Sequence, residues 1–175
     1  MIRPYPPTLE DIPISNKNPS FTDLLQSPTL LLAFGFGSGL APKAPGTFGT
    51  LAAIPLWLLL CQLPLSLYWA VVAISAIAGI YICGRASSKL GVHDHSGIVW
   101  DEFVGLWIAL AFIEPQLTSI IVGFLLFRLF DILKPWPISW LDKQVGAGIG
   151  IMIDDIVAGF FAAIVLVVIS NLGFL

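Results

Sequence analysis

The feature that most constrains this chain is its division into six apolar segments, near residues 29–37, 48–64, 67–84, 98–113, 115–133 and 151–170. Of its 175 residues, 57% are hydrophobic and only 11% are charged, whereas soluble domains carry roughly 25% charged residues. The sequence therefore predicts an integral membrane protein. This length allows one domain, and a net charge of −3 is too small to indicate nucleic-acid binding.

The first apolar segment differs from the other five. It is short, follows Pro28 and is interrupted by glycine, which favours an interfacial or re-entrant helix. The other segments give about five candidate spans, with turns expected at Pro64 and Pro115. We expect a flexible cytoplasmic lead over residues 1–27 and a single membrane-embedded domain over residues 28–175. Small residues lie within the spans, as they do where membrane helices pack closely: Gly79, Gly105, Gly123 and Gly159.

Charged residues gather on one side of such a five-span arrangement. The opposite turns contain no lysine or arginine, and an excess of basic residues marks the cytoplasmic face. The basic residues on this face are Lys43, Arg85, Lys89, Arg128, Lys134 and Lys143. The same face also carries acids that this rule does not explain: Asp94, Asp101, Glu102, Asp131, Asp142, Asp154 and Asp155.

Adjacent carboxylates open two of the most apolar segments, in the sequences WDEFVG (100–105) and IDDIVAG (153–159). A carboxylate at the middle of a span costs roughly 2.5–3.5 kcal/mol on insertion scales, but one in the first turn can reach water. The pairs can therefore be interfacial groups or ligands of a cation. Converging like charges in a low dielectric favour a cation among them, and oxygen ligands without His or Cys favour Mg²⁺ over zinc. The glycines one turn later would let a neighbouring backbone approach beneath the acids.

Cationic groups on this face favour phosphate chemistry. In FRLFDILKPWP, Arg128, Asp131 and Lys134 follow at i, i+3 and i+6, close to one helical stripe. A metal with neighbouring cations is typical of phosphoryl transfer, in which water can be the nucleophile.

A glycine- and proline-rich loop supplies a third element, GFGSGLAPKAPGTFGT (35–50). Its glycines allow close backbone approach, and Thr47 can cap the helix that follows, whose first N–H groups would bind phosphate. Glycine and proline also mark ordinary turns, so the loop indicates phosphate binding mainly through Lys43.

Four blocks of the sequence resemble the signatures of the phosphatidylglycerophosphatase A family: GFGSGLAPKAPGTFGTLAAIP, GVHDHSGIVWDEFVG, FRLFDILKPWPI and GIMIDDIVAGFFAA. The similarity runs from about Pro28 to Ile169. It implies an all-α membrane bundle and a Mg²⁺-dependent phosphatase of the bacterial inner membrane. This enzyme would remove the terminal phosphate of the anionic lipid phosphatidylglycerophosphate at the cytoplasmic face. No protein partner is implied. The family's HDP-type continuation is replaced by His95-Ser96-Gly97, so we expect no essential role for His95.

The resemblance carries site roles to matching positions of this chain. Metal ligands are expected at Asp101, Asp131, Asp154 and Asp155, and phosphate-binding groups at Lys43, Thr47 and Lys134, to which Arg85 is added as a further cation of the same face. Catalytic roles are expected for Glu102, Asp94 and His93. Glu102 is either a ligand or the base that orients water, and Asp94 either a ligand or the partner of His93. Arg128 either binds phosphate or pairs with an acid.

Two alternatives remain from the sequence. One is a lipid phosphatase of broader specificity that accepts phosphatidic acid. The other is a divalent-cation transporter, for which acids near the middle of several spans would be expected, whereas these acids crowd one end. The number of metal ions, the oligomeric state and the choice between direct water attack and a phospho-aspartate are not determined by the sequence.

Overall fold

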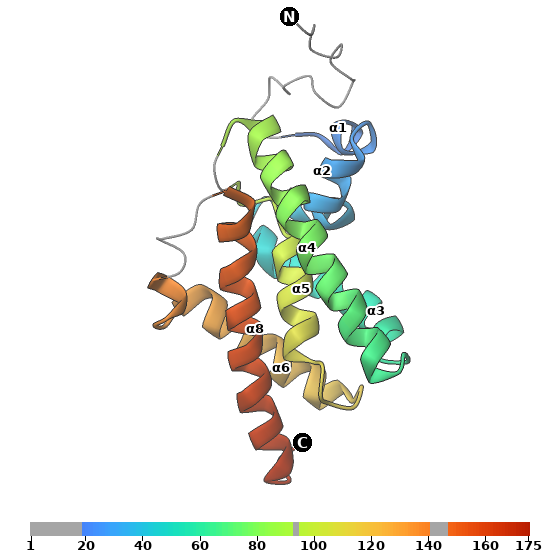
Figure 1. Ribbon diagram of the computed structural model, residues 1–175, viewed down its shortest axis with the longest axis vertical. Helices are drawn as coiled ribbons and strands as arrows, with labels where there is room; N and C mark the ends of the chain where they lie inside the picture. The colour runs from blue at the N-terminus through green and yellow to red at the C-terminus, as the bar shows by residue number, and fades with distance from the viewer. Residues whose placement is uncertain (1–18, 93–94, 141–146) are drawn as a thin grey trace, which may run out of the picture.

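The computed structural model describes residues 19–92, 95–140 and 147–175 (Figure 1). All the regular elements in these ranges are helices, which confirms the predicted all-α class. They are α1 (Phe21–Leu25), α2 (Pro28–Ala33), the 3-10 helix η2 (Gly35–Leu40), α3 (Pro45–Leu60), α4 (Leu65–Leu90), α5 (Trp100–Ala109), α6 (Leu117–Leu133) and α8 (Ala147–Asn171).

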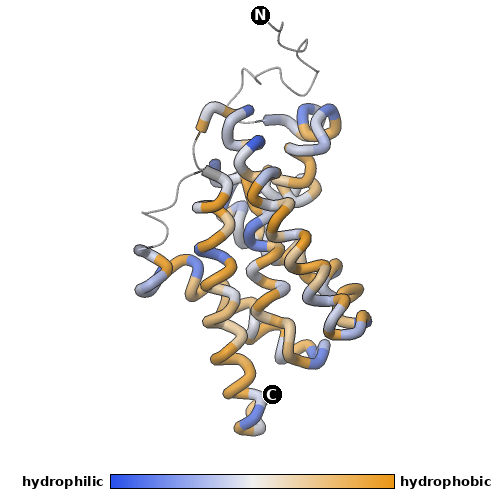
Figure 2. Tube along the Cα trace, in the orientation of Figure 1, coloured by the Kyte–Doolittle hydropathy of each residue, from blue (hydrophilic) through white to orange (hydrophobic). Residues whose placement is uncertain are grey.

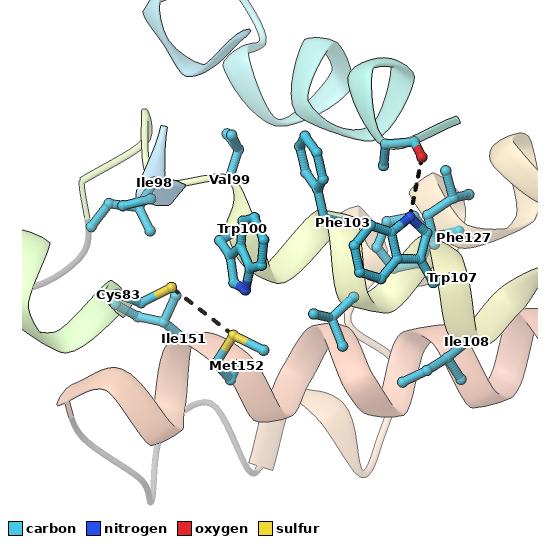
Figure 3. Packing of buried hydrophobic residues seen from close by; sticks show 14 of the residues in the cluster. Cys83, Ile98, Val99, Trp100, Phe103, Trp107, Ile108, Phe127, Ile151 and Met152 are labelled. Carbon is cyan, nitrogen blue, oxygen red and sulfur yellow. Dashed lines mark hydrogen bonds between the residues drawn. The ribbon is translucent and has the colours of Figure 1, made fainter. Parts of the chain in front are cut away.

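Helix α5 is the centre of the bundle. It packs against α8, α3, α4 and α6, and every one of its residues except Asp101 is buried. Its aromatic residues Trp100, Phe103 and Trp107 lie between α3 on one side and α8 on the other (Figure 3). Trp107 Nε1 donates to the carbonyl of Ala53 at 3.1 Å, and so satisfies its polar atom within the apolar core. A short helix without exposed faces can thus hold polar groups at a fixed place in the core.

The glycines of α5 and α8 lie where the two helices cross. A Cβ placed on Gly159 would collide with the carbonyl of Gly105, and one on Gly105 would meet the carbonyl of Asp155 at 2.9 Å. The expected close backbone approach beneath the acids is confirmed. A second close approach joins α8 to α4, because a Cβ on Gly148 would collide with the carbonyl of Ile80.

Two helices of the described chain, rather than five, are long and apolar enough to cross a bilayer: Leu65–Leu90 in α4 and Gly148–Asn171 in α8. The other apolar segments fold into shorter helices, of 16 residues in α3, 10 in α5 and 17 in α6. These helices are shorter than the apolar segments because some residues of each segment form the turns at the predicted prolines or the polar ends of the helices. Figure 2 shows that the lower part of α8 is hydrophobic, whereas polar residues gather in the upper half of the bundle.

The N-terminal part is more structured than the sequence predicts. Helix α1 lies within the expected flexible lead, and its residue Leu24 is completely buried. A capping box explains its start, since Ser20 Oγ accepts from the Asp23 amide and Asp23 accepts in return from the Ser20 amide. The short interfacial helix expected over residues 29–37 corresponds to α2 and η2, which the Val99 amide tethers by donating to the Ala33 carbonyl at 2.8 Å.

The helix crossing provides a stability test. Gly159→Ala should lower the free energy of unfolding by roughly 1–3 kcal/mol, because its methyl group would overpack the α5 backbone. Gly84→Ala is the matched control, since its Cβ would lie 3.5 Å from Gly148, an ordinary contact. Thermal unfolding in detergent measures both variants. Equal melting temperatures for the two would contradict the proposed role of the crossing.

Candidate metal and phosphate site

Three carboxylates converge between α5 and α8. One oxygen each from Asp101, Glu102 and Asp155 can be chosen so that all lie within 4.8 Å of one another. Glu102 and Asp155 are buried residues, with 9% and 3% of their surfaces exposed. Each of the three side chains also has a buried oxygen without a hydrogen-bond partner among the described residues: Asp101 Oδ1, Glu102 Oε2 and Asp155 Oδ2. These three orphaned oxygens distinguish the group from interfacial acids that reach water.

The electrostatics of this group require a cation or protons. Three carboxylates at this spacing repel one another, and burial removes the water that would screen them. Their oxygens are hard ligands of the kind that Mg²⁺, Mn²⁺ and Ca²⁺ prefer. The residues therefore fit a divalent cation, with Asp101, Glu102 and Asp155 as its protein ligands.

Arg128 on α6 connects three helices beside the carboxylates. Its NH1 lies 2.6 Å from Asp131 Oδ2 and 3.7 Å from Glu102 Oε1, and it donates to Thr50 Oγ1 at 3.4 Å. Of the two roles left open for Arg128, the pairing with an acid is confirmed. Because it contacts α3 and α5 as well as its own helix, Arg128 acts as a positioning residue for Glu102.

The start of α3 reaches the same place. A Cβ on Gly46 would collide with Glu102 Oε1 and lie 3.2 Å from Arg128 NH1, so a larger residue here would displace the ends of these two side chains. Thr50 Oγ1 donates to the Gly46 carbonyl at 2.8 Å. The positive end of α3 therefore lies against the acidic group, and its first N–H is that of Gly46, because Pro45 has none and the Thr47 and Phe48 amides donate to the Ala44 carbonyl.

The predicted capping role of Thr47 is wrong. The N-cap is Ala44, in the left-handed region at φ 48°, and α3 has no side-chain cap. Pro45 has the fixed φ that suits the first helical position, so the helix begins before Thr47 is reached. Thr47 is half-buried in the first turn, and Lys43 is exposed in the loop before it.

Asp154 points to a different partner from its neighbour. Its Oδ2 lies 2.6 Å from Lys134 Nζ, and its Oδ1 accepts from the amide of Asp155. Lys134 leaves the expected stripe because α6 ends at Leu133 and Lys134 takes a left-handed conformation at φ 42°. The structure therefore divides the four predicted metal ligands. Asp101 and Asp155 converge with Glu102, whereas Asp131 and Asp154 each form an ion pair with a cationic side chain, and Asp131 also interacts with Asp155.

The remaining predicted residues lie outside this group or outside the described residues. Arg85 is on α4, with its guanidinium carbon 5.9 Å from the centre of the Tyr81 ring. His93 and Asp94 lie outside the described residues. Sequence reasoning missed Gly46 and Thr50, although their i, i+4 spacing at the start of an apolar helix is a signal that they share one face.

The chain is similar in sequence to known proteins over most of its length. A model of the phosphatidylglycerophosphatase A family matches residues 31–170. The chain is 50% identical over 148 residues to the phosphatidylglycerophosphatase A of Escherichia coli (strain K12), covering 84% of this chain and 86% of that protein. It is 46% identical over 155 residues to the phosphatidylglycerophosphatase A of Haemophilus influenzae, covering 87% and 94%. No solved structure matches the chain.

The ion pair of Arg128 with Asp131 gives a prediction for a double-mutant cycle. Arg128→Met should destabilise the protein by roughly 3 kcal/mol, since it leaves the largely buried Asp131 without its cation, and Asp131→Asn should cost less, because Arg128 still lies 3.7 Å from Glu102. The double variant should lose less than the sum, with a coupling energy of roughly 0.5–3 kcal/mol. Denaturant unfolding in detergent measures the cycle. Strictly additive losses would show that the pair does not stabilise the fold.

Proposed function

Because the chain belongs to the phosphatidylglycerophosphatase A family and is a phosphatase, we propose that it hydrolyses the terminal phosphate monoester of phosphatidylglycerophosphate. The product is phosphatidylglycerol, and the cofactor is Mg²⁺. The observation that carries the proposal is the convergence of Asp101, Glu102 and Asp155, each with a buried oxygen that has no other partner in the described chain.

The cation site and the start of α3 both act on the phosphate of the substrate. A bound Mg²⁺ supplies charge neutralisation for the transferring phosphoryl group. The Gly46 amide, the first N–H of α3, donates to a phosphate oxygen, and exposed Lys43 reaches the same phosphate from the preceding loop. Because Gly46 lies against Glu102, a phosphate held by α3 also lies beside the carboxylates.

The other predicted residues keep narrower roles. Glu102 binds the cation and also orients the attacking water. It can do both because Arg128 NH1 lies close to Oε1, whereas Oε2 has no hydrogen-bond partner among the described residues. Lys134 and Thr47 assist phosphate binding, Lys134 while paired to Asp154. Arg85 holds a phosphate oxygen. His93 protonates the leaving oxygen, and Asp94 either orients His93 or binds the cation.

We further propose that the enzyme is a multi-pass protein of the bacterial inner membrane, with α3, α5 and α6 completing the crossings that α4 and α8 make. The C-terminus of α8 lies at the end of the bundle opposite α1 and α2 (Figure 1). Lys89 in the last turn of α4 and the Arg128–Asp131 pair mark the cytoplasmic side.

Mg²⁺ should stabilise the protein as well as activate it. At 100 times its dissociation constant the ion should add roughly 2.7 kcal/mol to the free energy of unfolding, because it relieves repulsion among the three carboxylates. Asp101→Asn, Glu102→Gln and Asp155→Asn should each lose most of this gain and most phosphate release. Melting curves with EDTA and with graded Mg²⁺, together with phosphate release from phosphatidylglycerophosphate in detergent, test this.

Two matched variants control the metal experiment. Glu114→Gln removes an exposed carboxylate in the loop before α6 and should behave like the parent. Asp154→Asn should lower stability equally with and without Mg²⁺, because its carboxylate pairs with Lys134. If the parent's melting temperature ignores Mg²⁺, the site is not a metal site. If metal binds but no phosphate is released, a transporter becomes the better interpretation.

Topology can be tested by thiol labelling in intact cells, in a variant whose accessible Cys61 is replaced by serine. A cysteine in place of Phe174, which is exposed near the end of the chain, should react with an impermeant reagent. A cysteine in place of Lys43 should react only after the membrane is permeabilised. Labelling of both positions from outside would place the loop before α3 on the wrong face.

A further inference from the structure

A cavity of about 280 Å³ lies beside the start of α3. Its walls come from η2, from the loop before α3 and from the turn before α5. The residues that the argument uses are Phe34, Pro42, Pro45, His95 and Ser96. At this volume it suits a small fragment of a ligand, since pockets for whole drug-sized molecules span roughly 300–1,000 Å³.

The walls of this cavity are fixed by backbone contacts. A Cβ on Gly39 would collide with the carbonyl of Gly97, so the 3-10 helix and the turn before α5 touch directly. The turn is closed by the Ile98 amide, which donates to the His95 carbonyl at 2.8 Å. Ser38 Oγ donates to the Gly35 carbonyl at 2.8 Å within η2. The cavity is therefore preformed and needs little ordering when it binds a ligand.

The cavity and the carboxylates share the start of α3. Pro45 lines the cavity, and the next residue, Gly46, lies against Glu102 and Arg128. Lys43 stands between two lining residues, Pro42 and Pro45. A ligand whose phosphate occupies the N-terminus of α3 can therefore extend its adjoining group into the cavity.

The lining favours an uncharged, hydroxylated group. None of the lining residues that the structure describes is a lysine, arginine, aspartate or glutamate, so they provide no fixed charge that would select a second phosphate. His95 Nδ1 accepts from the Gly97 amide at 3.0 Å, and the proton of the neutral ring is therefore on Nε2. The ring packs 5.4 Å from Phe34, and Ser96 adds a hydroxyl that both donates and accepts. One apolar surface with neutral donors and acceptors matches a short polyol.

We propose that this cavity binds the glycerol that adjoins the scissile phosphate of the lipid headgroup, and that His95 and Ser96 are specificity-determining residues. This inference rests on the proposed function and goes beyond it, because it assigns the part of the substrate that distinguishes phosphatidylglycerophosphate from phosphatidic acid, in which no headgroup glycerol is present. His95, for which the sequence predicted no essential role, thus acts in selectivity.

Paired kinetics test the assignment. Ser96→Leu and His95→Leu should lower kcat/KM for phosphatidylglycerophosphate roughly 10-fold, mainly through KM, and leave phosphatidic acid of the same acyl chains unchanged. Ser88→Leu is the matched control, because Ser88 is an exposed serine of α4 outside the cavity lining. An equal fall for both lipids, or no change in their ratio, would overturn the proposal.

A binding measurement separates this proposal from the proposed function. The chain has only two histidines, so the His95 imidazole resonance can be assigned by its loss in His95→Leu. Glycerophosphoglycerol, a deacylated headgroup, should shift that resonance in the full-length protein, and inorganic phosphate should not. A shift with the headgroup but no lipid hydrolysis would reject the proposed function alone. A shift only with inorganic phosphate, or none with either probe, would reject the polyol site.

Discussion

The repulsion among three converging carboxylates, two of them buried, is the constraint on which the rest of this structure depends. Asp101, Glu102 and Asp155 can approach one another only because two glycines let the backbones of α5 and α8 touch just beneath them. Each acid costs free energy to bury, and the neighbouring helices supply the compensation. Arg128 neutralises one side of the group, and the positive end of α3 faces it at Gly46. The helix contacts that pack this end of the bundle therefore also hold the carboxylates in place.

The sequence predicted the parts of this arrangement that depend on local pattern. The acid pairs, the glycines one turn beyond them and the turn prolines are all visible within a few residues, and the all-α class followed from a resemblance in four such blocks. Burial of charge in an apolar segment is costly enough that the acids indicated a site without knowledge of the fold. The pairing of Arg128 with Asp131 was also within reach, because it needs only one turn of one helix.

The sequence did not show which acids converge and which form ion pairs, because this depends on where the helices end and how they are rotated. Lys134 leaves the helical path at the end of α6 and so reaches Asp154 on another helix. Helix length was overestimated for a related reason. Hydropathy does not show how many residues of an apolar segment are used in turns, and α5 retains only 10. Thr47 was assigned to the cap because propensity favours threonine there, although Pro45 sets an earlier start.

Neighbouring residues of a helix point about 100° apart, and α8 uses this at Asp154 and Asp155. One side chain meets Lys134 and the other meets the carboxylates of α5. The rest of α8 is apolar on all sides, so lipid and neighbouring apolar side chains discriminate weakly among rotations about its axis. Together with the close backbone contacts of Gly148 and Gly159, the two adjacent acids therefore set the azimuth of a 25-residue helix. This rotation makes Phe160, Ile164 and Val168, about one to four turns further along, its outward face.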